Sequence, residues 1–190
     1  MPERTLRKES MEEIVAFIGS WHPLLVHLPI GMLIMAFLLE WLARKERYAA
    51  LRPAVNVVLL AGCITAILSC VAGYFLSLGG GYHENTLAWH KWLGIGVALV
   101  AAIAWTLKRF PQKTPRLQTL HFPLLVFLML LLTAAGHYGG SLTHGSDYLS
   151  KSLPGPVRGL FGLPDREAEA LPVIADVQEA AVFDEVIRPV

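Results

Sequence analysis

The sequence predicts an all-α protein that crosses a membrane four times, a polytopic helix bundle with extramembrane tails. Hydrophobic residues make up 54% of the 190 residues, and charged residues only 16%, against roughly 25% in soluble domains. The chain has 16 basic and 15 acidic side chains, and only 13 of these 31 fall within residues 21–149. We therefore expect a lead-in at 1–20, a four-helix transmembrane domain at 21–149 and a tail at 150–190.

Four stretches are long and apolar enough to span a bilayer, which takes about 20 residues of helix. They cover residues 24–43, 54–78, 89–107 and 120–139. The first contains Pro29, which has no N–H to donate to the carbonyl of Leu25. We expect this helix to be kinked, with Pro23 in its first turn.

The loop charges predict the orientation, because Lys and Arg are retained on the cytoplasmic side of short loops. The loop at 79–88 has no Lys or Arg, whereas the other two loops are basic: they hold Arg44, Lys45, Arg47, Arg52, Lys108, Arg109, Lys113 and Arg116. We expect a multi-pass protein of the bacterial inner membrane with both termini in the periplasm.

The two tails are more polar than the spans. Residues 11–19 fit either a short helix on the outer membrane surface or an ordinary charged lead-in. Residues 154–164 are rich in Pro and Gly, which indicates a linker. The acidic segment at 166–190 is compatible with a helix but too short to build its own core.

Several functional classes lack support in the sequence. The net charge of +1 provides no basic field for a nucleic-acid partner. No P-loop, GxSxG, HExxH or paired-carboxylate arrangement is present. Glu40 is expected to reach the inner headgroups near Arg44, with a role in proton entry as the alternative.

The seven histidines are the most informative feature, because ionisable groups in membrane spans are usually functional or paired. Only His121 falls at the inner surface. The other six fall at or just below the outer surface: His22, His27, His83, His90, His137 and His144. Ordinary interface histidines would be shared more evenly between the two surfaces.

This clustering predicts a b-type haem, because haem iron accepts imidazole as an axial ligand and helix bundles hold cofactors between facing helices. His27, His90 and His137 are the deepest histidines on regular helix. We expect His27 and His90 to ligate one haem, with His137 and His22 supplying a second site or hydrogen bonds to the first. The alternative for each is an interface residue bonded to a carbonyl or water.

The second span carries a stripe of small residues on one face: Gly62, Ala66, Cys70, Gly73 and Ser77. Such stripes let helix backbones approach closely, and the alternative is that a flat macrocycle lies against this one. Cys63 and Cys70 are expected to be apolar fillers. No CxxCH is present, so no haem c is expected within the chain.

Three motifs at the outer ends of the spans carry most of these histidines: HPLLVHLPIG at 22–31, WHKWLG at 89–94 and GHYGGSLTHGSDYL at 136–149. Together they resemble the uncharacterised four-helix bacterial membrane domain that often precedes planctomycete-type cytochrome c domains. The resemblance covers about residues 20–150. It implies a membrane electron-transfer module whose histidine positions are matched here by His22, His27, His90, His137 and His144.

The last residues, VFDEVIRPV at 182–190, are similar to the helix that leads into such cytochrome c domains. The c-type haem would then belong either to a longer product or to a partner protein. The leading hypothesis is an electron-transfer subunit, rather than a stand-alone enzyme, that relays electrons between a membrane donor such as quinol and a periplasmic cytochrome c. A haem-free anchor subunit of a respiratory or photosynthetic complex and a copper or zinc site remain as alternatives.

Overall fold

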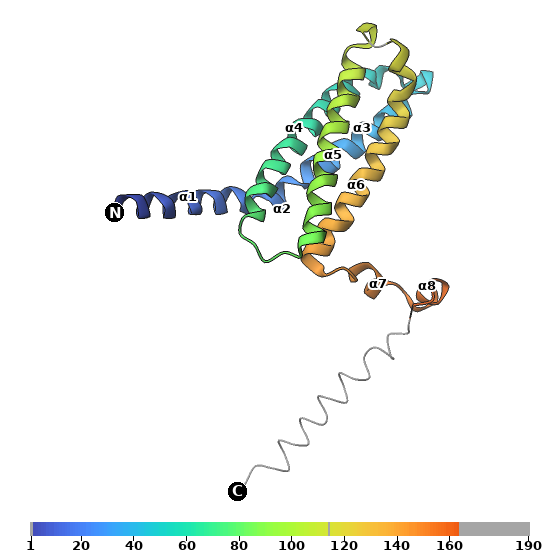
Figure 1. Ribbon diagram of the computed structural model, residues 1–190. Helices are drawn as coiled ribbons and strands as arrows, with labels where there is room; N and C mark the ends of the chain where they lie inside the picture. Colours follow the sequence, from blue (N-terminus) through green and yellow to red (C-terminus); the bar gives the residue numbers. More distant parts are fainter. Residues whose placement is uncertain (1, 114, 164–190) are drawn as a thin grey trace. The chain divides into compact units, whose positions relative to one another are not determined.

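The computed structural model describes residues 2–113 and 115–163, and within them every regular element is a helix (Figure 1). The long helices are α1 (Pro2–Ser20), α3 (His27–Ala43), α4 (Arg52–Ser77), α5 (Glu84–Arg109) and α6 (His121–His144). The short ones are α2 (His22–Leu25), η1 (Glu46–Leu51), η2 (Pro111–Lys113), η3 (Pro115–Leu120), α7 (Tyr148–Ser152) and α8 (Gly155–Leu160). The predicted all-α class is confirmed.

Four helical segments are long and apolar enough to cross a membrane: Lys8–Ala43, Glu46–Ser77, Glu84–Arg109 and Arg116–His144. Three of them contain a predicted span, and Glu46–Ser77 covers all but the last residue of the predicted span at 54–78. Many large apolar side chains on these helices are exposed, among them Ile64, Ile67, Leu68 and Val71 of α4. An apolar surface of this extent suits contact with lipid rather than water.

The first span is divided at Val26, where the backbone keeps right-handed helical angles (φ −62°, ψ −27°), and the kink expected from the prolines stays a prediction. The α2 helix ends at Leu25 and α3 begins at His27, so Pro29 falls in the first turn of α3, where a backbone N–H has no intrahelical acceptor. Pro29 therefore costs the helix little, because the hydrogen bond to Leu25 that it could not make lies at the boundary between two helices.

The core of the bundle lies between α3, α4, α5 and α6 and is built of small and medium-sized apolar side chains. Its buried cluster comprises Leu33, Ala36, Leu59, Cys63, Val97, Val100, Ala101, Ala104, Leu125, Leu128 and Ala135. Close approach depends on the predicted small-residue stripe of α4: a Cβ at Gly62 would lie only 2.7 Å from Leu33 Cδ2. The stripe therefore seats α3 against α4.

The described residues from His144 to Leu163 belong to a second compact unit. Its α7 helix precedes the Pro/Gly-rich region at 154–164, and α8 lies within it. Arg158 of α8 donates from Nη1 to the carbonyl of Ser150, 2.8 Å away. Lys151 hydrogen-bonds Asp147 at 2.6 Å and so holds the pKa of the Asp147 carboxyl below its ordinary value. The predicted acidic segment at 166–190 lies outside the described residues.

The contact between α1 and α4 can be tested at Gly19. A Cβ at Gly19 would lie 2.7 Å from the backbone nitrogen of Leu76 and 2.8 Å from its Cα, and main-chain atoms cannot rotate away. We expect Gly19→Ala to lower the free energy of unfolding by about 1–3 kcal/mol, measured by thermal melting in detergent.

Gly31→Ala is the matched control, because no atom lies within 4 Å of a Cβ at Gly31. Its alanine keeps the gain in helix propensity, about 1 kcal/mol, without a clash. Equal stability of the two variants would contradict the close contact between α1 and α4.

Candidate functional site

Two polar clusters lie at opposite ends of the apolar core. One is formed where α2 and the first turns of α5 meet the last turns of α4 and α6, and it contains His22 and His90. The other is formed where α3 and α5 end and α6 begins, and it contains Glu40, Lys108 and His121. Neither cluster is composed of residues that are close together in sequence.

His22 is carried on α2 and packs against α4. Its Nδ1 lies 2.9 Å from the backbone carbonyl oxygen of Ser69. Its ring fills the space over Gly73, where a Cβ would lie 2.7 Å from Cε1 of the ring. The small-residue stripe of α4 therefore serves two purposes, seating α3 at Gly62 and the imidazole of His22 at Gly73.

His90 of α5 repeats this arrangement against α6. Its Nδ1 lies 3.0 Å from the carbonyl oxygen of Ala135, and a Cβ at Gly139 would lie 3.0 Å from Cε1 of its ring. Both imidazoles are thus half-buried, each bonded to a backbone carbonyl and each lying over a glycine.

The two rings lie edge-on to each other. Their centres are 6.0 Å apart and their planes are inclined by 79°. A carbonyl oxygen can only accept, so Nδ1 of each ring is the donor and, in the neutral imidazole, Nε2 keeps its lone pair. The two rings could thus each offer Nε2 to a metal ion or a metal-containing cofactor.

His27, which the sequence predicts to be the partner of His90, is not brought to it. Its side chain is exposed, and Nδ1 lies 2.7 Å from the carbonyl oxygen of Pro23, within the same segment of chain. The helical period is the physical reason: five residues place His22 and His27 about 140° apart around the helix axis, so His22 packs inward while His27 lies on the exposed side.

His137 is also exposed, and its ring stands edge-on to Tyr138 with the ring centres 5.6 Å apart. Tyr138 in turn stacks on Trp89, one residue before His90. His144 is exposed and lies beside Tyr148. Within residues 2–113 and 115–163, no group of three or more His, Cys, Asp or Glu side chains could hold a metal ion.

The cluster at the other end is a buried ion pair with a histidine. Lys108 Nζ donates to Glu40 Oε2 at 2.6 Å, and His121 Nδ1 lies 3.5 Å from Glu40 Oε1. The three side chains are only 18%, 15% and 6% exposed, in the order Lys108, Glu40, His121. His121 Nε2 is buried without a hydrogen-bond partner in the described part of the chain.

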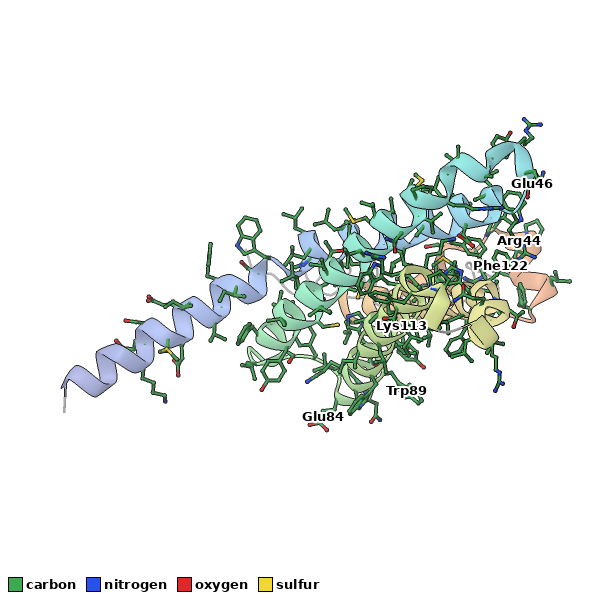
Figure 2. The ribbon with its side chains drawn as sticks, turned by 90° about the horizontal axis from the view of Figure 1, so that it is seen from above. Arg44, Glu46, Glu84, Trp89, Lys113 and Phe122 are labelled. Atoms are coloured by element: carbon green, nitrogen blue, oxygen red, sulfur yellow. The ribbon has the colours of Figure 1, made fainter. Side chains whose placement is uncertain are left out.

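Glu40 was expected near Arg44 and the headgroups, and the structure corrects this. Arg44 is exposed and its guanidinium lies over the ring of Phe122, 4.3 Å from the ring centre (Figure 2). Glu40 instead points into the bundle, because its strongest available partner is the Lys108 ammonium of α5. Sequence reasoning missed this triad, although the presence of one acidic residue inside a span is a signal for a buried partner.

These features define a polytopic, all-helical membrane protein with a pair of anchored imidazoles at one end of its bundle. The chain belongs to the family described as predicted membrane protein (DUF2231), whose model matches residues 20–147. This confirms the expected membership of an uncharacterised membrane-domain family over about residues 20–150, whereas its fusion to cytochrome c domains stays a prediction. No curated protein and no solved structure matches the chain.

The Glu40–Lys108 pair can be tested with a double-mutant cycle. Lys108→Met leaves a buried carboxylate without its cation, so we expect the free energy of unfolding to fall by about 3–5 kcal/mol. Adding Glu40→Gln should recover most of the loss, as measured by denaturation in detergent.

Lys45→Met removes an equal charge from an exposed site and should change stability by no more than about 0.5 kcal/mol. A Lys108→Met variant as stable as Lys45→Met would contradict the buried pair.

Proposed function

We propose that this protein is a membrane electron-transfer subunit that holds a b-type haem between His22 and His90. The observation that carries the proposal is the pair itself: two imidazoles 6.0 Å apart, each with Nδ1 engaged by a carbonyl and Nε2 available. Ligating histidines in metalloproteins characteristically donate their other N–H to a carbonyl or carboxylate.

The residues fit haem better than a metal held by protein ligands alone. Zinc sites take three or four protein ligands, and the described residues offer no such group. Haem needs only the two axial positions, since the porphyrin supplies the rest. Copper and zinc therefore rank below haem.

The chain's own residues would hold the group and set its properties. The carbonyls of Ser69 and Ala135 fix the orientation of the two rings and raise the basicity of Nε2. Gly73 and Gly139 provide the space in which the rings lie. When bound, haem iron with two imidazole ligands exchanges single electrons and has no open position for oxygen, which favours a carrier over a stand-alone enzyme.

The position of the pair suggests the partners. His22 and His90 lie at the end of the bundle whose loop, 79–88, has no Lys or Arg, which the positive-inside rule assigns to the periplasm of a bacterial inner membrane. An electron acceptor or donor there would be a periplasmic cytochrome c, and a quinol is the candidate partner within the membrane.

One observation favours a second candidate, a haem-free anchor subunit of a respiratory or photosynthetic complex. Each imidazole already has a carbonyl partner and a glycine to pack against, so the pair is also a complete interhelical contact without any cofactor. This candidate predicts a colourless protein after haem-replete expression.

Substitution of the histidines distinguishes a haem-binding electron carrier from a haem-free anchor subunit. We expect His22→Ala and His90→Ala each to abolish the haem Soret band of the purified chain, because one imidazole cannot replace the lost ligand. His27→Ala is the matched control, since His27 is exposed five residues from His22, and should retain full haem content. Size-exclusion chromatography and circular dichroism check that each variant is folded.

If the wild-type chain shows no haem band after haem-replete expression, the haem proposal is wrong and the anchor subunit is the better assignment. A haem band lost in His27→Ala but retained in His22→Ala would overturn the proposed ligand pair.

A further inference from the structure

A hollow of about 640 Å³ lies at the end of the bundle opposite the histidine pair. It is formed where α4 begins, α5 ends and η3 passes by, and its polar lining consists of Arg52, Asn56, Lys108, Arg109 and Gln118. None of these residues belongs to the proposed haem site, so binding in the hollow does not depend on the haem proposal.

The charge of the lining is positive. It contains three cations and no carboxylate. The charge of Lys108 is neutralised by Glu40. Arg52 forms an ion pair with Glu46 at 3.5 Å, and because both side chains are exposed this pair contributes little to stability. Arg109 forms no ion pair with any described residue, and its guanidinium lies beside the ring of Phe110. The hollow is therefore suited to an anion.

The uncharged polar side chains of the lining indicate that the ligand also carries a hydrogen-bond donor. Asn56 Oδ1 is buried and has no hydrogen-bond partner within the described part of the chain. A buried acceptor without a donor destabilises the folded protein. Gln118 is held in place by its bond from Nε2 to the carbonyl of Leu107, 2.9 Å away. A ligand that satisfies this lining carries a hydroxyl donor as well as negative charge.

The depth of the hollow indicates where such a ligand comes from. Arg52 and Arg109 lie at or near one end of the spanning segments Glu46–Ser77 and Glu84–Arg109, so the hollow sits at the level of the lipid headgroups. Basic pockets between helices at this level bind anionic headgroups. Arginine forms two parallel hydrogen bonds to a phosphate.

We propose that this hollow binds the headgroup of an anionic phospholipid, with Arg52 and Arg109 contacting the phosphate and Asn56 accepting a hydrogen bond from a headgroup hydroxyl. Phosphatidylglycerol has both features.

The test measures the melting temperature of the full chain in detergent while lipid is titrated. We expect phosphatidylglycerol to raise it and phosphatidylcholine to leave it unchanged. Arg109→Gln should weaken the apparent affinity for phosphatidylglycerol about tenfold, the effect of losing a hydrogen bond to a charged group. Arg47→Gln is the matched control, because Arg47 is an exposed arginine of the same loop region that does not line the hollow.

Phosphatidylmethanol, which has the same charge but no headgroup hydroxyl, tests the role of Asn56. The wild type should prefer phosphatidylglycerol, and Asn56→Ala should lose that preference while keeping its affinity for phosphatidylmethanol. An equal loss in Arg47→Gln, or no preference for phosphatidylglycerol over phosphatidylcholine, would overturn the site. Equal stabilisation by inorganic phosphate at the same concentration would overturn the lipid as its ligand.

Discussion

The helical period of the first span is the constraint on which the arrangement at the histidine end depends. The backbone stays right-handed helical at Val26, between α2 and α3, so His22 and His27, five residues apart in sequence, lie about 140° apart around the helix axis. His22 packs on Gly73 of α4, and His27 stays on the exposed side. The partner of His90 is therefore decided by the face of the first span that meets α4.

The bundle keeps its polar groups at its two ends and an apolar core between them, because a polar group in hydrocarbon must find a partner inside the protein. Each end meets this requirement differently. At one end, backbone carbonyls of α4 and α6 accept from the imidazoles, and glycines make room for the rings. At the other, Lys108 neutralises Glu40 across the bundle. The first solution engages Nδ1 of both rings, and the second places the charged groups of Glu40 and Lys108 together at the opposite end of the core.

Much of the fold was predictable from the sequence, whereas the pairing within the site was not. Apolar length alone located the four spans, and the small-residue stripe of α4 indicated a close helix contact. The clustering of histidines near one surface was visible in the same way. The direction of each side chain was harder to predict: His22 and His27 lie on different faces of the first span, and the structure places His22, not His27, beside His90. The role of each histidine as a haem ligand stays a prediction. Glu40 and Lys108 are 68 residues apart, and no spacing rule connects them.

The most direct test of the His22–His90 pair is the electron paramagnetic resonance spectrum of the oxidised, haem-loaded chain. Two imidazole nitrogens on the ferric iron would give a low-spin signal, which is the result that the proposed pair predicts. A high-spin signal would mean that only one histidine binds the iron. That result would contradict a single ligand pair formed by His22 and His90.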